Sequence, residues 1–132
     1  MRLNQVTLPV MDMELAATFY RKMGFLQIVD TPHYARFSCP DGDATFSLAL
    51  REDAGTSNAV IYFELDDLDK KVAELVQRGF VFDQQPTDMP YLWREAVLQD
   101  PSGNKIKLYF AGENRLNPPW RVERTDASPA EA

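Results

Sequence analysis

The chain has 132 residues, of which 45% are hydrophobic and 11% aromatic, and this is enough apolar material for one compact domain with its own core. Its net charge of −6 disfavours nucleic acids and anionic membranes as partners, and its single cysteine excludes an intrachain disulfide. No stretch approaches the ~20 apolar residues of a membrane-spanning helix, and the first residues, MRLNQVTLPV, lack the apolar core of a signal peptide. We therefore expect a soluble, cytoplasmic protein that binds neither nucleic acid nor membrane.

The chain begins with a pattern typical of a strand and then of a helix. A strand is predicted over residues 3–10, because Val6, Leu8 and Val10 are apolar at every second position. Pro9, which has no N–H, should place this strand at a sheet edge or near its own end. A helix is predicted over residues 13–23, because Asp12 is a good N-cap and Gly24 suits a left-handed helix terminus. The expected buried stripe of this helix is Leu15, Phe19 and Met23.

Three short strands are predicted next, over residues 26–30, 34–39 and 45–51. A polar segment at 52–58 then separates the two halves of the chain.

The second half predicts the same order of elements. A strand over 60–65 leads through an N-cap at Asp67 to a helix over 68–78, with Leu68, Val72, Leu75 and Val76 facing inward. Strands are expected at 81–82, 93–99 and 105–110, and residues 84–92 are expected to form a loop that is a candidate lid. In the tail after residue 111, Trp120 could cap a site, join a dimer interface or anchor the tail to its own domain.

The two halves are copies of one unit. Residues 4–25 align without a gap on residues 59–80, and both copies run from an alternating strand through an acidic turn to a helix that ends on Gly-Phe. The chain therefore divides into a first module at 1–53, a linker at 54–58, a second module at 59–111 and an extended tail at 112–132. Both modules read β-α-β-β-β, and together they make one compact domain.

Three segments carry a resemblance to a known family: LPVMDMELAATFYRKMGF, YFELDDLDKKVAELVQRGF and LQDPSGNKIKLYF. They resemble the vicinal oxygen chelate superfamily, which includes glyoxalase I, extradiol dioxygenases and bleomycin-resistance proteins. The resemblance implies an α+β fold in which two tandem βαβββ modules form curved mixed sheets around a shared cleft, with the helices outside. It also implies a homodimer.

Strand alternation sorts the side chains by face. The apolar face of each predicted strand should pack under the helices, and the opposite face should line the cleft. The expected ligand-binding side chains are Gln5, Thr7, Tyr34, Arg36, Ser47, Val60, Tyr62, Trp93, Glu95, Lys107 and Tyr109. Lys107 and Arg36 could bind an anionic group between aromatic walls, unless Glu95 neutralises one of them.

The resemblance also implies where metal ligands would stand, namely at Gln5, Ser47, Val60 and Lys107. Only Gln5 is of a ligand type used in the family, and a tight site needs three or four donors. His33 and Cys39 are the only imidazole and thiol, and neither supports a site. We therefore expect no metal and no other cofactor.

Two classes of function remain open, and no catalytic residue is assigned. The first is a protein that binds a small, partly aromatic or anionic molecule in the cleft between the modules. The second is a lyase, isomerase or dioxygenase with an atypical metal site that includes Gln5, or with acid/base chemistry by Glu95, Tyr62 or Lys107. A structural or regulatory dimer without a ligand is a weaker third hypothesis.

Overall fold

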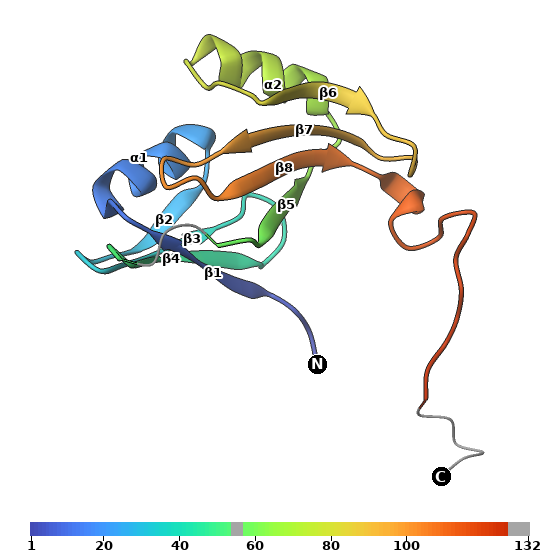
Figure 1. Cartoon of the computed structure of the whole chain (residues 1–132), viewed down its shortest axis with the longest axis horizontal. Helices are drawn as coiled ribbons and strands as arrows, with labels where there is room; N and C mark the ends of the chain where they lie inside the picture. Colours follow the sequence, from blue (N-terminus) through green and yellow to red (C-terminus); the bar gives the residue numbers. More distant parts are fainter. Residues whose placement is uncertain (54–56, 127–132) are drawn as a thin grey trace.

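The computed structural model describes residues 1–53 and 57–126; residues 54–56 of the expected linker and 127–132 of the expected tail lie outside the described part. The chain forms an α+β fold of two tandem modules (Figure 1). The first module contains β1 (Gln5–Val10), α1 (Met13–Met23), β2 (Leu26–Asp30), β3 (Tyr34–Ser38) and β4 (Thr45–Leu50). The second contains β5 (Val60–Glu64), α2 (Leu68–Gln77), β6 (Gln84–Asp88), β7 (Arg94–Gln99) and β8 (Lys105–Phe110), followed by a short 3₁₀ turn, η1 (Gly112–Asn114).

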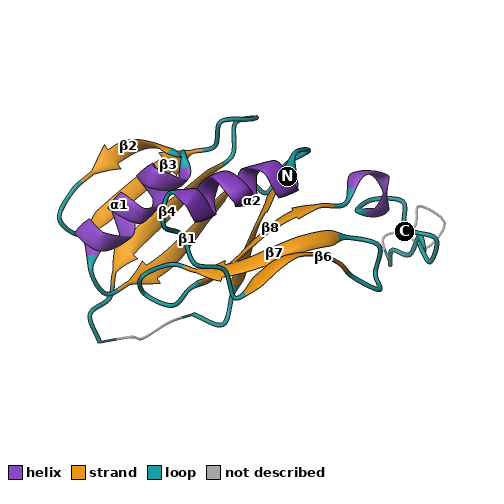
Figure 2. Cartoon of the chain, turned by 90° about the horizontal axis from the view of Figure 1, so that it is seen from above, coloured by secondary structure: helices purple, strands orange, loops and turns teal. Residues whose placement is uncertain are grey.

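Each module folds its strands into one open, mixed four-stranded sheet. The strand orders are β1-β4-β3-β2 and β5-β8-β7-β6, with the first strand of each module parallel to the last and the other pairs antiparallel. The two helices lie on the same side of the molecule, as the view from above shows (Figure 2). Pro9 lies on an edge strand of its sheet, as predicted, so its missing N–H breaks no strand pairing.

The helix ends explain why the helices form where they do, with one difference between the modules. The backbone N–H of Leu15 donates to the Asp12 carboxylate at 3.0 Å, and Gly24 and Gly79 take positive φ angles of 118° and 96° after the helices. Asp67 precedes α2 but its side chain makes no capping hydrogen bond, so the cap predicted there is wrong. Its φ and ψ of −98° and 58° depart from the extended N-cap geometry that Asp12 adopts.

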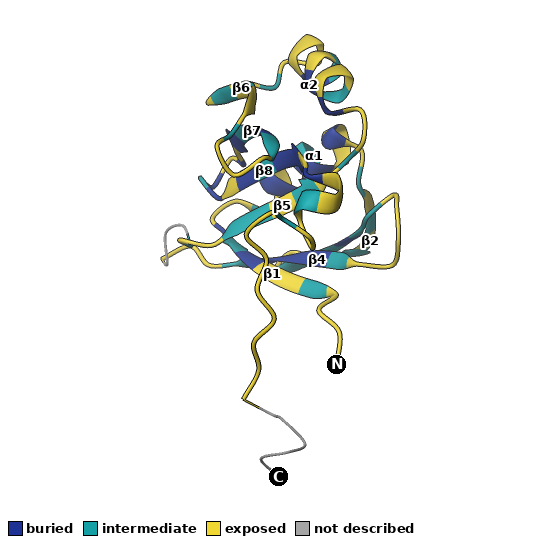
Figure 3. Cartoon of the chain, turned by 90° about the vertical axis from the view of Figure 1, so that its right-hand side faces the viewer, coloured by how far each residue is buried: buried dark blue, intermediate teal, exposed yellow. Residues whose placement is uncertain are grey.

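One hydrophobic core extends through both modules (Figure 3). The ring of Phe63 on β5 lies 4.6 Å from that of Phe25 and 5.4 Å from that of Phe46, while Phe19 on α1 meets Phe80 at 5.1 Å. The modules therefore bury apolar surface against each other.

Buried hydrogen bonds also join the modules. The Tyr20 hydroxyl on α1 donates to the Asp100 carboxylate at 2.8 Å, and the Asn104 amide donates to the Pro9 carbonyl at 2.7 Å. Asp100 is held in place by three further donors, the backbone N–H groups of Ser102 and Asn104 and the Asn104 side chain. Burial, and then the Asp100 carboxylate, raise the pKa of Tyr20.

Two side chains expected in the core are exposed. Leu15 on α1 is 59% exposed, and Val76 on α2 is 45% exposed. The side of α1 that meets the sheet carries Ala16, Ala17 and Tyr20 together with Met23. The face of α1 that packs on the sheet is therefore rotated relative to the predicted stripe. Because two of its residues are alanines with small side chains, the helix can lie close to the strands.

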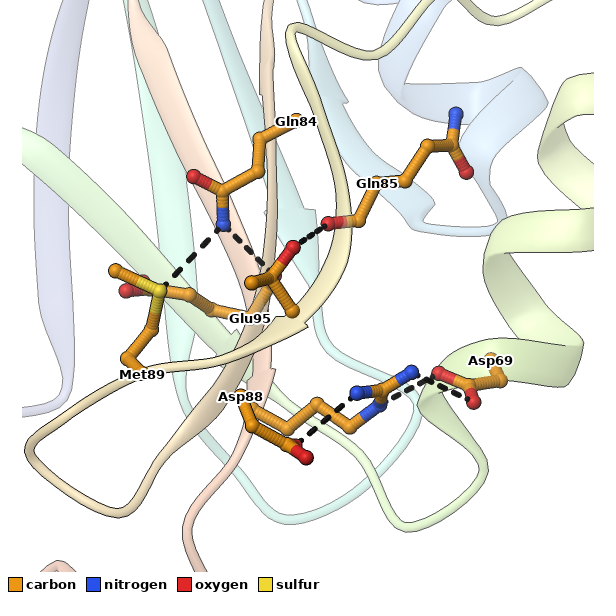
Figure 4. Close-up of polar contacts among 8 residues, drawn as sticks. Asp69, Gln84, Gln85, Asp88, Met89 and Glu95 are labelled. Atoms are coloured by element: carbon orange, nitrogen blue, oxygen red, sulfur yellow. Dashed lines mark hydrogen bonds and ion pairs between the residues drawn. The ribbon is translucent and has the colours of Figure 1, made fainter.

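The sequence prediction is also wrong between residues 81 and 92. Residues 81–82 form no strand, and residues 84–88, expected to be part of a loop, form β6. Pro86 is tolerated because β6 is an edge strand whose pairing with β7 is interrupted between Gln84 and Thr87. Side chains hold β6 in place: the Gln84 amide donates to the Glu95 carbonyl at 3.1 Å (Figure 4). Arg94 on β7 pairs with Asp88 on β6 and with Asp69 on α2.

Within the described residues, no helix is both long enough and apolar enough to cross a bilayer.

Candidate functional site

Side chains alternate in direction along the strands, which gives each sheet a core face and an opposite, outer face. Burial alternates with direction on β3, whereas Ser47, Glu95 and Tyr109 are buried although they belong to the outer faces. In the middle of the central strands the core-face side chains are at most 3% exposed, namely Ala35, Phe37, Leu48, Ala96, Leu98, Ile106 and Leu108. Phe110, at the end of β8, is 41% exposed. The residues between these core-face positions therefore project from the opposite face of each sheet. Most of the expected ligand-binding side chains belong to these outer faces, and they form two separate groups of contacts.

The outer face of the first sheet carries a row of hydrogen-bonded polar side chains. The Gln5 amide donates to the Ser47 hydroxyl at 2.5 Å, and this hydroxyl lies 2.6 Å from the Tyr34 phenol oxygen. Arg36 donates to the same phenol oxygen through Nε at 3.2 Å and Nη2 at 3.0 Å. At the other end of the row, the Thr45 hydroxyl donates to the side-chain amide oxygen of Gln5.

The outer face of the second sheet carries an aromatic cluster, which comprises Tyr62, Trp93 and Tyr109. The rings of Trp93 and Tyr109 stack with centroids 4.7 Å apart and planes 23° apart. Tyr62 stands nearly perpendicular to both, at 6.1 Å from Trp93 and 5.6 Å from Tyr109. Tyr62 is 45% exposed, so the cluster offers an aromatic surface to a ligand.

An ion pair lies beside the aromatic cluster. The Lys107 ammonium is 3.1 Å from a carboxylate oxygen of Glu95 and 5.5 Å from the centre of the Tyr62 ring. Glu95 is only 1% exposed, and its two carboxylate oxygens accept no well-aligned hydrogen bond from the described residues. The alternative in which Glu95 neutralises a lysine is therefore confirmed, and its partner is Lys107 and not Arg36.

β1 and β5 are edge strands of their sheets. A groove of about 640 Å³ runs between these edge strands and is lined by Gln5, Thr7, Val60 and Tyr62 among other residues. Among the described residues, no hydrogen bond, ion pair or ring contact joins the row on the first sheet to the cluster on the second. The structure thus brings four of the expected residues to one groove and leaves the other seven on their own sheets.

Glu64 is a residue of this region that the sequence prediction missed. One of its carboxylate oxygens accepts from the backbone N–H groups of Ala111 and Gly112, at 2.8 and 3.1 Å. Burial, and then the Glu64 charge, raise the pKa of Tyr109. The alternation that selected Val60 and Tyr62 also selects Glu64, so the sequence contained the signal.

The four positions at which the family resemblance implies metal ligands do not suit a divalent cation. Gln5 and Ser47 are hydrogen bonded to each other, Val60 has no ligand atom, and Lys107 presents an ammonium that is paired with Glu95. Among the described residues, no three His, Cys, Asp or Glu side chains gather into a group that could hold a metal ion. Burial, and then Asp41, raise the pKa of Cys39, which disfavours its thiolate.

Comparison with known proteins identifies the family to which the chain belongs. Residues 2–108 match the family model described as the Glyoxalase/Bleomycin resistance protein/Dioxygenase superfamily. No curated protein matches the chain.

Solved structures share the fold at low sequence identity. A superfamily member from Sphaerobacter thermophilus is 24% identical, with a TM-score of 0.71 over 83% of this chain and 97% of that one. A lactoylglutathione lyase from Agrobacterium tumefaciens is 16% identical, with a TM-score of 0.72 over 88% and 96%. A bleomycin-binding protein in complex with bleomycin is 19% identical, with a TM-score of 0.69 over 83% and 98%.

Proposed function

Because the chain belongs to the Glyoxalase/Bleomycin resistance protein/Dioxygenase superfamily, we propose that it binds a small molecule between its two modules and does so without the usual metal site. The ligand is partly aromatic or anionic. The protein acts as a homodimer in the cytoplasm. The bleomycin-binding relative gives a precedent for binding of a small molecule on this fold.

The observation that carries this proposal is the aromatic cluster beside the groove. Tyr62 belongs to both, since it lines the groove between β1 and β5 and stands against Trp93 and Tyr109. A volume of about 640 Å³ is in the range of small-molecule sites. A flat ring bound in the groove can therefore contact Tyr62 while its polar groups reach Gln5 and Thr7.

The donor chemistry supports binding without a metal. At the four inherited positions only the Gln5 amide oxygen and the Ser47 hydroxyl are neutral oxygen ligands, and both are already hydrogen bonded. A divalent cation at Gln5 and Ser47 would have to compete with these hydrogen bonds.

Tryptophan fluorescence tests the ligand site, because the chain has only two tryptophans. In a screen of aromatic carboxylates, a binding compound should change the emission of the wild-type protein. Trp93→Leu should remove the response and weaken binding measured by calorimetry, while Trp120→Leu, on the exposed tail, should keep both. Equal binding by Trp93→Leu and wild type would place the ligand elsewhere.

Elemental analysis tests the metal. The purified protein should contain no stoichiometric metal, and added Zn²⁺, Ni²⁺, Mn²⁺ or Fe²⁺ should not raise its thermal midpoint. Stabilisation by one of these ions that Gln5→Ala removes would contradict the metal-free site and support an enzyme.

A further inference from the structure

The polar row on the first sheet has a fixed direction of hydrogen bonding. The Thr45 hydroxyl donates to the side-chain amide oxygen of Gln5, which fixes the orientation of this amide. The NH₂ group of the same amide therefore faces Ser47 and donates to its hydroxyl at 2.5 Å. Ser47 is fully buried, and Tyr34 is the one other described side chain bonded to its hydroxyl. The Ser47 proton therefore finds its acceptor in the Tyr34 oxygen, since a buried hydroxyl without an acceptor is costly.

This direction decides where the proton of Tyr34 lies. Its oxygen accepts from Ser47 and from two N–H groups of Arg36, and a guanidinium can only donate. The Tyr34 proton has no acceptor left within the row, so it points toward the open face of the sheet. Nη1 of Arg36 has no partner among the described residues either. Two outward donors, one neutral and one cationic, thus lie side by side at the end of the row.

The charges around Tyr34 favour an anion at this position. The charged group that acts on the Tyr34 phenol is Arg36, whose guanidinium carbon lies 5.5 Å from the centre of the Tyr34 ring. The side chains that continue the row on β4 and β1 are the uncharged Ser47, Thr45 and Gln5. The nearest acid on the neighbouring strand β2 is Asp30, which lines a hollow next to α1 on the other side of the sheet. The Ser47 hydrogen bond, and then Arg36, lower the pKa of Tyr34.

We propose that Tyr34 and Arg36 form a carboxylate-binding site that releases its ligand when Tyr34 loses its proton. One carboxylate oxygen accepts from the Tyr34 hydroxyl and the other from Nη1 of Arg36. Ionisation removes the hydroxyl donor and puts a phenolate against the ligand, so anion binding and deprotonation exclude each other. The site rests on the proposed function, since the row that leads to Tyr34 includes Gln5, which lines the groove of the proposed ligand.

Benzoate titrations by calorimetry at several pH values test this site on the whole chain. Wild-type affinity should be constant around neutral pH, where benzoate is ionised, and then fall about tenfold per pH unit, beginning below the ordinary phenol pKa of about 10. Tyr34→Phe should bind benzoate more weakly than wild type at neutral pH, with an affinity that no longer changes over this range. Arg36→Gln should lose at least tenfold, whereas Arg21→Gln, a matched change on the exposed part of α1, should behave as wild type.

The Ser47→Ala variant distinguishes loss of benzoate affinity caused by ionisation of Tyr34 from loss caused by a general effect of high pH on the protein. Without the hydrogen bond that stabilises the phenolate, the fall in affinity should begin at a higher pH than in wild type. A Tyr34→Phe profile identical to wild type, or equal affinities for Arg36→Gln and Arg21→Gln, would overturn the site while leaving the proposed function in place. If neither benzoate nor any other aromatic carboxylate bound the wild type at any pH, both proposals would fail.

Discussion

The outer faces of the two modules carry different chemistry although their backbones follow one plan. In the first module, a row of hydrogen-bonded neutral side chains runs from Thr45 to Tyr34, and Arg36 donates to Tyr34 at the end of this row. In the second, an aromatic cluster stands beside a hidden ion pair between Lys107 and Glu95. The first face therefore offers directed donors, and the second offers flat apolar surface.

The contrast is sharpest at two corresponding positions, because Ser47 and Lys107 are each the third residue of the last strand of their module. A hydroxyl can be satisfied by neutral neighbours, whereas a largely buried ammonium requires an acid, which β7 provides as Glu95. The core faces differ little by comparison, since Leu48 and Leu108 are both buried leucines. The duplicated core restrains the inner faces, and the outer faces are free to diverge.

The largest effect is expected from a charge in the core that both modules share. Leu108→Asp should abolish soluble folded protein, because an unpaired charge at a 3% exposed position has no partner. Lys105→Asp, on the same strand but exposed, should fold. Two-dimensional NMR of any soluble Leu108→Asp protein distinguishes shared from separate cores. Native signals from the first module alone would show that the modules fold independently.

The two corresponding positions should differ in their contribution to stability. Lys107→Met leaves Glu95 buried without its counter-charge and should cost about 3 kcal/mol in urea unfolding. Ser47→Ala removes only neutral hydrogen bonds and should cost about 1 kcal/mol. Adding Glu95→Gln to Lys107→Met should recover most of the loss. Equal losses in the two single variants would mean that the ion pair does not form.

Tyr20→Phe tests the hydrogen bond that joins the modules. Loss of a buried donor to the Asp100 carboxylate should cost about 2 kcal/mol at neutral pH. The pKa of Tyr20 is raised in the folded state, so the unfolded chain loses this proton first, and stability should fall as pH rises above about 10. Tyr20→Phe should have a shallower fall, which denaturation curves at pH 9 to 11 would reveal.

The smallest expected effect compares the two helix starts. Asp12→Ala should lower stability by about 1 kcal/mol, because the Leu15 N–H loses its acceptor. Asp67→Ala should change it by only a few tenths, since Asp67 makes no capping hydrogen bond. Thermal midpoints of the two variants measured side by side give the answer, and a larger shift for Asp67→Ala would reverse the assignment of the caps.

Local signals in the sequence were sufficient for most of the fold. Residues 13–23 are helical as predicted, because Asp12 and Gly24 fix both ends through short-range hydrogen bonds. The strand at 84–88 was missed because QQPTD has neither apolar alternation nor β-branched content apart from Thr87, and Pro86 argues against a strand. Pairing with β7 forms this strand, and such pairing is a tertiary effect.

The candidate site was predictable in its faces but not in its contacts. Alternation placed Tyr34 and Arg36 together, as it did Glu95 and Lys107, because side chains two apart in a strand share a face. The choice between Lys107 and Arg36 as the partner of Glu95 depends on which strands adjoin, and the sequence left it open. Similarly, Leu15 and Tyr20 lie on different sides of α1, and only docking on the sheet decides which side is buried.

The prolines of β1 and β6 have a consequence for solubility. An open sheet exposes unpaired backbone groups along its outer strands, and these groups can recruit a strand from another chain. Pro9 removes one donor from such an edge in the first sheet and Pro86 does so in the second, where the interrupted pairing near Gln84 further distorts the edge. Each module thus carries a built-in obstacle to the edge-to-edge growth from which amyloid-like aggregates form.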